Sequence, residues 1–292
     1  HIEDNQILIL TDRERSLPMS DKNQRQLFIS IGCAIQNIIT AAHYYSLEAR
    51  IDYPDNNQTA ARITFVPQND QSKPGEITIR AILTRHTNRN KYKNSALPAD
   101  FLTRLSLYNS SEIQTIFIQD EKQKEHLANI VSDALITAMD DQGFREELSH
   151  YIKSNITKSK IGMPLFGFGM PTPISLIAPL LIKFININKM SRKQDEELLK
   201  RYTPVFGIIS TIHDDKRSWI NTGMHYERIA LEAEQIGIKT APMAAAIQIG
   251  NFYQKLQTEI HTMLRPQVFF RMGYADLLMK HSPRLPIEEV SN

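Results

Sequence analysis

The chain contains only one cysteine, Cys33, among its 292 residues, so it cannot form an intrachain disulfide. Such cysteine usage is typical of a reducing compartment, and we expect a cytoplasmic protein with Cys33 in a helical core. The start at His1 also lacks the charged and apolar segments of a secretory signal. Because the first residue is not methionine, we expect further sequence upstream of His1.

A strong excess of one charge is missing as well. The 34 Lys+Arg residues nearly balance the 32 Asp+Glu residues, which leaves a net charge of +2. A nucleic-acid-binding protein would carry a dominant basic face, so we do not expect a nucleic acid as partner. The length and the hydrophobic fraction of 41% are ordinary for a globular protein of one or two domains.

Two common kinds of site find no support in the sequence. Gly167-Phe168-Gly169 lacks the spacing and the preceding strand of a dinucleotide-binding loop, so a Rossmann domain is not expected. No Ser/His/Asp order or metal-spaced His/Cys set is present, and we expect no metal site and no catalytic acid, base or nucleophile. His213-Asp214-Asp215 is interpreted as a solvated cap at the head of a helix rather than a metal site.

Charged residues are absent from residues 161–182, a stretch long enough in principle to cross a bilayer. Pro164, Pro171, Pro173 and Pro179 interrupt this stretch and argue against one continuous spanning helix. A membrane partner is therefore not expected. An apolar flap over a pocket or a partner-facing surface is the preferred interpretation.

The hydrophobic pattern predicts strands and helices that interleave without a regular βαβ rhythm, which indicates an α+β fold. Asp21 is the expected N-cap of the first helix. The expected strands span residues 7–10, 61–66, 113–118, 205–211 and 267–274. The expected helices span residues 22–45, 75–84, 121–139, 141–153, 215–237 and 250–263, with a short helix after Pro98.

The two long helices overlay at a fixed offset of 191 residues, which places Gly32 on Gly223, Ala42 on Ala233 and Leu47 on Ile238. A glycine inside a helix costs about 1 kcal/mol relative to alanine, so both glycines indicate close packing on another helix or on a ligand. The simplest account is a duplicated unit whose long helices pack as in a two-fold dimer. Chance similarity between two amphipathic helices is the alternative.

The five residues Arg85-His86-Thr87-Asn88-Arg89 form a candidate anion-binding site directly after an expected helix. Arginine offers a flat fork of donors suited to phosphate, and a nearby hydroxyl can complete the contact. The alternative is a solvated basic cluster, because positive charge at the C-terminal end of a helix also complements the helix dipole.

This motif is similar to the Arg-Arg/His-Ser-x-Arg/Lys signature of the nitroreductase family, whose members hold FMN at the interface of a homodimer; Thr87 stands in place of Ser. Two further segments resemble family features in the same order. Ala241–Ala246 resembles the proline-led loop whose backbone amides face the flavin N5. Ser282–Pro286 resembles the family tail, in which a basic residue precedes Leu-Pro.

With the duplicated helix, the chain resembles the Acg-type subfamily, in which two nitroreductase-like halves are fused and one chain mimics the dimer. The resemblance implies tandem half-repeats at residues 1–72 and 73–292, an apolar lid insertion at about 154–190, and a monomer that is an intramolecular pseudo-dimer. Only the second half carries the flavin motifs, since residues 48–57 match nothing. One FMN per chain is therefore implied.

The resemblance also implies which side chains hold the cofactor. Arg85, Thr87 and Arg284 are expected to bind the FMN phosphate, with Arg89 as a supporting cation. His86 is expected to reach the ribityl chain or the pyrimidine edge of the flavin.

The N5 position of the flavin is expected to face backbone amides of Met243, Ala244 and Ala245. Family members usually carry Glu-Gly in this loop, so the two alanines are a departure. A second departure is the subfamily segment Ser-x-x-Asn-x-Gln-Pro-Trp, which we expect upstream of His1.

The implied function is that of an FMN-dependent oxidoreductase. NAD(P)H would reduce the flavin, and a nitroaromatic or quinone-like acceptor would reoxidise it. A flavin-sequestering protein with a closed lid and no turnover is the second possibility. A helical interaction protein without cofactor is the third.

Overall fold

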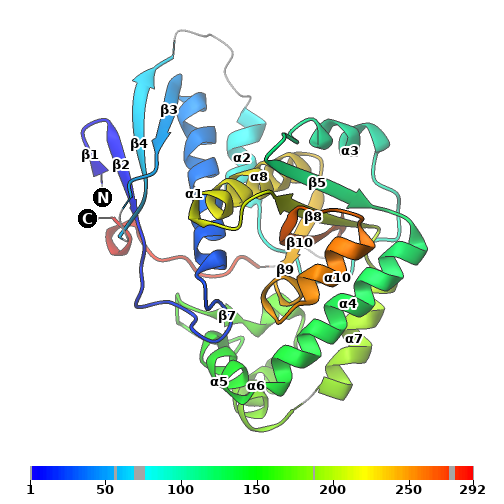
Figure 1. Cartoon of the computed structure of the whole chain (residues 1–292). Helices are drawn as coiled ribbons and strands as arrows, with labels where there is room; N and C mark the ends of the chain where they lie inside the picture. Colours follow the sequence, from blue (N-terminus) through cyan, green and yellow to red (C-terminus); the bar gives the residue numbers. More distant parts are fainter. Residues whose placement is uncertain (1, 56–57, 69–75, 187, 276–279, 292) are drawn as a thin grey trace. The chain divides into compact units, whose positions relative to one another are not determined.

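The computed structural model describes residues 2–55, 58–68, 76–186, 188–275 and 280–291 (Figure 1). The chain divides into two compact units, each assembled from separated stretches of sequence. Unit 1 comprises residues 1–85, 214–237 and 285–292, and unit 2 comprises residues 86–213 and 238–284. These units are defined by compactness, and the expected repeat boundary after residue 72 stays a prediction.

Unit 1 contains an antiparallel sheet of order β1-β2-β4-β3 together with helices α1, α2 and α8. The strands are β1 (Ile2–Glu3), β2 (Gln6–Leu10), β3 (Leu47–Asp52) and β4 (Thr59–Pro67). The helical elements are α1 (Arg25–Tyr44), α2 (Glu76–Thr84), α8 (Lys216–Gln235) and the single 3-10 turn η2 (Ile287–Glu289).

Helix α1 begins three residues later than the expected start at residue 22. The Asp21 carboxylate nevertheless caps it, accepting the backbone N–H groups of Gln26 and Leu27 at 3.0 Å each. The helix is long and apolar enough to cross a membrane by length and composition alone. Its apolar face instead forms the core of unit 1 with β4 and Ile220 of α8, although Ala34, expected on that face, is exposed.

The crossing of α1 and α8 brings the two overlaid glycines together. A Cβ atom on Gly32 would lie 2.0 Å from the Ile220 carbonyl oxygen and 2.9 Å from the Gly223 Cα. A Cβ atom on Gly223 would lie 1.9 Å from the Ile29 carbonyl oxygen and 2.9 Å from the Gly32 Cα. Ile29 and Ile220 are related by the same offset of 191 residues, so the contact is reciprocal. The expected close packing of the two glycine-bearing helices is confirmed.

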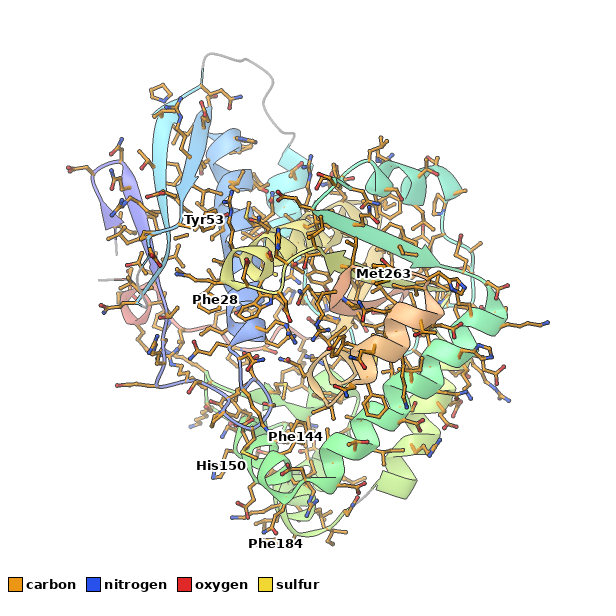
Figure 2. The ribbon with its side chains drawn as sticks, in the orientation of Figure 1. Phe28, Tyr53, Phe144, His150, Phe184 and Met263 are labelled. Atoms are coloured by element: carbon orange, nitrogen blue, oxygen red, sulfur yellow. The ribbon has the colours of Figure 1, made fainter. Side chains whose placement is uncertain are left out.

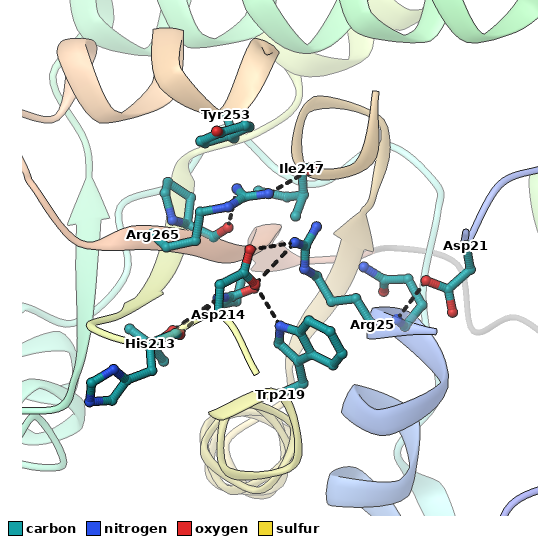
Figure 3. Close-up of polar contacts among 12 residues, drawn as sticks. Asp21, Arg25, His213, Asp214, Trp219, Ile247, Tyr253 and Arg265 are labelled. Atoms are coloured by element: carbon teal, nitrogen blue, oxygen red, sulfur yellow. Dashed lines mark hydrogen bonds and ion pairs between the residues drawn. The ribbon is translucent and has the colours of Figure 1, made fainter. Parts of the chain in front are cut away.

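An ion pair between a buried arginine and an exposed aspartate joins the start of α1 to the residue two positions before α8 (Figure 3). The Arg25 Nη2 atom, on a nearly fully buried side chain, donates to both carboxylate oxygens of Asp214 at 2.8 and 3.0 Å. The Trp219 indole N–H donates to the same carboxylate at 2.7 Å. Trp219 also stacks on Phe28, its counterpart at the 191-residue offset, with ring centroids 6.1 Å apart.

The single cysteine lies at this crossing. The Cys33 Sγ donates to the Gly223 carbonyl oxygen at 3.3 Å. Burial of the thiol, followed by the charge of Glu227, raises the pKa of Cys33 well above its ordinary value. Cys33 is therefore held as a neutral thiol.

Unit 2 contains a second antiparallel sheet, of order β5-β8-β10-β9, with helices packed on it. Its strands are β5 (Ile113–Ile118), β8 (Val205–Thr211), β9 (Ile238–Met243) and β10 (Arg265–Tyr274), with the short parallel pair β6 (Ile152–Lys153) and β7 (Met163–Pro164). Its helices are α3 (Ala99–Ser106), α4 (Glu121–Asp140), α5 (Gln142–Tyr151), η1 (Leu165–Phe168), α6 (Thr172–Phe184), α7 (Asn188–Arg201), α9 (Ala245–Gln248) and α10 (Phe252–Glu259). The expected α+β class is confirmed by both sheets.

Several element boundaries differ from the sequence-based expectation. The helix expected over residues 250–263 is only α10, because Gly250 and His261 at its two ends adopt left-handed backbone angles, φ 45° and 51°. The expected start of α2 at Gly75 lies outside the described residues. Strands β3 and β9 and helix α7 were not expected at all.

The two sheets share one connectivity and one irregularity. In each sheet, one strand is followed in the sequence by a long helix, then by an edge strand, and then by a strand that pairs with both. The first series is β2-α1-β3-β4 and the second is β8-α8-β9-β10. Each sheet also contains a β-bulge at the same point. Ala60 has no pairing residue in β2 where β4 pairs with that strand, and Gln267 has no pairing residue in β8 where β10 pairs with that strand. Bulges of this kind are retained within families of related structures.

We predict that Gly223→Ala lowers the free energy of unfolding of unit 1 by about 1–3 kcal/mol, because the added methyl group would overlap backbone atoms of α1. Urea unfolding measures the change. Gly167→Ala is the control, because a Cβ there meets nothing within 4 Å. Equal stability of Gly223→Ala and the wild type would contradict the close crossing.

Candidate functional site

The candidate anion-binding motif is fixed to strand β9 in unit 2 through Asn88. The Asn88 backbone N–H donates to the Thr240 carbonyl oxygen at 3.1 Å, and the fully buried side chain accepts the Asn90 N–H at 3.0 Å. The Tyr92 hydroxyl donates to the Asn88 carbonyl oxygen at 2.7 Å. Hydrogen bonds therefore fix the segment after α2, which is not a freely solvated basic cluster.

The chain's tail reaches the same place. The His281 ring lies 4.6 Å from the ring of His86, which is buried, and the two planes are tilted by 52°. Ser282–Pro286 follows immediately, and within it the exposed Arg284 donates from Nη1 to the Ser282 carbonyl oxygen at 3.4 Å. The fold thus brings residues 86–90 together with strand β9 and with His281. More than 140 residues of sequence separate residue 90 from β9.

The apolar stretch between α5 and α6 also contacts the motif. The Arg89 guanidinium lies over the Phe168 ring, with Cζ 4.9 Å from the ring centroid. Gly169, at φ 69°, sits so close that a Cβ there would lie 3.3 Å from the Asn90 Oδ1. The middle of the segment expected as a lid therefore lies beside Arg89 and Asn90.

The expected proline-led loop differs from the structure. Residues 241–243 complete edge strand β9, in which Met243 pairs with Phe269 of β10, and α9 begins at Ala245. Helix α9 is a single turn of four residues, in which the Ile247 and Gln248 N–H groups donate to the Ala244 carbonyl oxygen at 3.0 Å each. Ala244 is exposed and Ala245 partly exposed, and neither methyl group obstructs an approaching ligand.

Arg85 takes a structural role that the sequence did not indicate. In unit 1 its Nε lies 2.7 Å from Oε1 of Glu227, a fully buried carboxylate on α8. The two groups therefore form a close ion pair. Burial raises the pKa of Glu227, and the charge of Arg85 opposes that rise. Removing either partner would leave the other uncompensated.

Among the other predicted residues, Thr87 is partly buried in the segment that Asn88 anchors. In the predicted cap His213-Asp214-Asp215, the His213 carbonyl oxygen accepts hydrogen bonds from the Thr211 hydroxyl and the Gln267 side-chain amide. Asp215 caps α8 by accepting the Ser218 N–H at 2.8 Å, which confirms the interpretation of that residue as a cap. The sequence placed Asn88 within the motif but did not indicate that it anchors the segment, and it gave no role to His281, Phe168 or Glu227. Of these last three, only His281 had a visible signal, because it directly precedes the basic tail.

Comparison with known proteins gives distant similarities. No family model matches the chain. The uncharacterized protein Rv3127 of Mycobacterium tuberculosis is 20% identical over 293 residues, covering 97% of this chain and 82% of that protein. The FMN-dependent nitroreductase NfnB from Mycobacterium smegmatis, solved in complex with NADPH, is 15% identical with a TM-score of 0.49 and covers 74% of this chain and 97% of that one. A nitroreductase with bound FMN from Desulfitobacterium hafniense is 11% identical with a TM-score of 0.46 and covers 75% and 98%.

We predict that Arg85→Met lowers the free energy of unfolding by about 3 kcal/mol or more, because it leaves the buried Glu227 carboxylate without its cation. The double variant Arg85→Met/Glu227→Leu should recover most of this loss. Chemical unfolding of both variants measures the difference. Equal losses in the single and double variants would contradict a structural ion pair.

A second titratable group on α8 makes stability depend on pH. Burial, and then the charge of Arg228, lowers the pKa of His225 to about 4. The folded chain keeps this imidazole neutral while the unfolded chain protonates it near pH 6.5. Its contribution to stability is therefore complete above that pH and is lost as the pH falls towards 4.

We predict that this group alone removes about 2 kcal/mol of unfolding free energy between pH 7 and pH 5. His225→Gln should reduce the pH dependence by that amount. Urea unfolding of the wild type and the variant at both pH values measures it. Identical pH dependence in the two proteins would show that His225 does not titrate in this way.

Proposed function

We propose that unit 2 binds one FMN and that the protein is an FMN-dependent oxidoreductase. FMN bound there would supply hydride transfer from NAD(P)H to an organic acceptor of nitroaromatic or quinone type. The observation that carries the proposal is the convergence of residues 86–90 with Thr240 of β9 and with His281, which directly precedes the basic tail. These residues lie in or directly beside the three segments in which the sequence resembles flavin-binding motifs, and the fold of unit 2 brings them together.

The donor set suits a phosphate monoester. Thr87 offers a hydroxyl, and Arg89 and Arg284 offer guanidinium groups whose planar forks match phosphate oxygens. His86 is proposed to contact the ribityl chain or the pyrimidine edge, since its ring is buried beside His281. The phosphate role of Arg85 also stays a proposal, and its ion pair with Glu227 gives it a structural function that needs no cofactor.

The reactive end of the flavin is proposed to face Met243, Ala244 and Ala245. Bound FMN would supply the hydride chemistry, and the chain would supply position and hydrogen-bond donors. Backbone N–H groups where β9 ends and α9 begins can donate to a flavin nitrogen. The small alanine side chains leave room for the ring. No acid, base or nucleophile is required from the protein.

A flavin-sequestering protein is the second candidate, and one contact favours it. Phe168 and Gly169 lie against Arg89 and Asn90, so the apolar segment already covers part of the motif. A cover that stayed closed would hold FMN and exclude an acceptor. The two candidates share their binding residues and differ in access to the flavin.

We further propose that the chain is a fusion of two related halves and acts as a monomer. Three observations support this: the common strand order of the two sheets, the matching bulges at Ala60 and Gln267, and the reciprocal contact of Gly32 with Gly223. A contact in which each residue meets its own counterpart is the signature of a two-fold interface.

We predict that Arg284→Ala weakens FMN binding roughly 10- to 150-fold, because a charge-assisted phosphate contact contributes about 1.5–3 kcal/mol. Titration of the chain with FMN, followed by flavin fluorescence, measures the affinity. Arg104→Ala, at an exposed arginine on α3, is the matched control. Unchanged affinity in Arg284→Ala would refute its phosphate role, and no binding by the wild type would refute the flavin site.

Turnover separates the two candidate functions. The FMN-loaded protein is mixed anaerobically with NADPH, and the flavin absorbance at about 450 nm, its usual band, is followed before an acceptor is added. Loss of the band followed by recovery on addition of a quinone supports the oxidoreductase. A band that persists in the presence of NADPH supports sequestration.

A further inference from the structure

Helix α6 of unit 2 carries its apolar residues on the outside. Its inner face consists of Ser175, Ala178 and Ile182, all buried, and the Ser175 hydroxyl accepts the Asn155 N–H at 3.0 Å. Its outer face leaves Ile177 53%, Leu180 62% and Phe184 72% exposed. A surface helix normally presents polar residues to water, so this helix reverses the usual pattern.

The exposed surface continues into the loop between β6 and β7, residues 154–162. The Asn155 amide donates to the Met170 carbonyl oxygen at 2.8 Å and to the Thr172 hydroxyl at 3.3 Å, which holds the loop against the start of α6. We call the combined surface the apolar face. It consists of Ile156, Ile174, Leu176, Ile177, Leu180 and Phe184, all exposed. Isolated exposed apolar residues are common, but a cluster of this kind marks an interaction surface.

The same part of the chain carries charge of one sign only. Residues 148–194 contain seven Lys or Arg residues and no Asp or Glu. The whole chain has a net charge of +2, so the rest of it has 27 basic and 32 acidic residues and a net charge of −5. Lys158 and Lys160 are exposed in the loop that packs on α6. Lys158 and Lys160 therefore place positive charge beside the apolar face, in a molecule whose remaining sequence is slightly acidic.

The combination of an apolar outer face and flanking lysines fits one surface in particular. An amphipathic helix lies in the headgroup region of a bilayer when it has large apolar residues on one side and basic residues beside them. Lys183 is placed for this, with its Nζ 5.5 Å from the Phe184 ring at the outer end of the helix, where Figure 2 labels Phe184. With 13 residues, α6 is too short to span the hydrocarbon core.

We propose that unit 2 binds the surface of an anionic lipid bilayer through the apolar face, with α6 lying in the plane of the interface and Lys158 and Lys160 facing the headgroups. The cytoplasmic leaflet, rich in anionic lipid, presents such a surface. Binding of this kind is peripheral and does not require a spanning segment. It also does not depend on FMN, so its test is separate from that of the flavin site.

Vesicle co-sedimentation of the full 292-residue chain tests the proposal. The probes are phosphatidylcholine vesicles and phosphatidylcholine vesicles that contain phosphatidylglycerol. We expect binding to the anionic vesicles that weakens at high salt, and much weaker binding to the neutral ones. No binding to either kind, or equal binding to both, would overturn the proposal.

Two variants test the two components of the surface. Ile177→Asp/Leu180→Asp should weaken binding to the anionic vesicles at least about tenfold, since it removes buried apolar area. Lys158→Glu/Lys160→Glu should also weaken it at least about tenfold, since each lysine near an anionic surface contributes a several-fold gain in affinity. All four positions are at least partly exposed, so the fold should persist, and circular dichroism checks this.

The controls place the same changes elsewhere on unit 2. Met263→Asp alters a side chain that is 96% exposed, and Lys122→Glu alters an exposed lysine on α4. Both should bind vesicles like the wild type, and equal losses in controls and test variants would overturn the proposal.

Sedimentation velocity without lipid tests whether a second copy of the chain covers the apolar face instead. An oligomer that Ile177→Asp/Leu180→Asp dissociates would assign the apolar face to a second copy of the chain and overturn the lipid assignment.

Discussion

The backbone contact between Gly32 and Gly223 is the constraint on which unit 1 depends. Two helices can approach this closely only where neither has a side chain, because an added Cβ would lie 1.9–2.0 Å from a carbonyl oxygen, far inside van der Waals contact. The approach lets Phe28 stack on Trp219 and brings Arg25 to Asp214. The ion pair of Arg85 with Glu227 then joins the end of α2 to α8. Unit 1 is thus made of sequence-distant segments joined by one close crossing, the partly exposed Arg25–Asp214 pair and the buried Arg85–Glu227 pair.

Much of this arrangement could be predicted from the sequence, because a long helix with one apolar face has a strong periodic signal. The starts and ends of β5 and β8 match the expectation, and α8 differs from it by only one or two residues at each end. The glycines at a fixed offset correctly indicated close helix packing. These features depend on local patterns that a reader of the sequence can see.

The features that the sequence did not reveal depend on tertiary contacts. Strand β9 contains Pro242, which usually argues against a strand, yet it is tolerated here because β9 lies at the edge of its sheet. Helix α7 is polar on most sides and has no clear apolar stripe. In the candidate site, the converging segments could be named, but the anchoring contacts of Asn88 and His281 could not be predicted. Their roles come from distant partners, Thr240 and His86.

The position of Cys33 gives the protein an internal reporter. Its thiol donates to the Gly223 carbonyl at the centre of the helix crossing, and burial keeps it protonated. Thiol reagents attack the thiolate, so this sulfur stays inert while the two helices remain together. The rate at which a thiol reagent modifies Cys33 therefore reports how often α1 separates from α8, and no label has to be engineered into the chain to measure it.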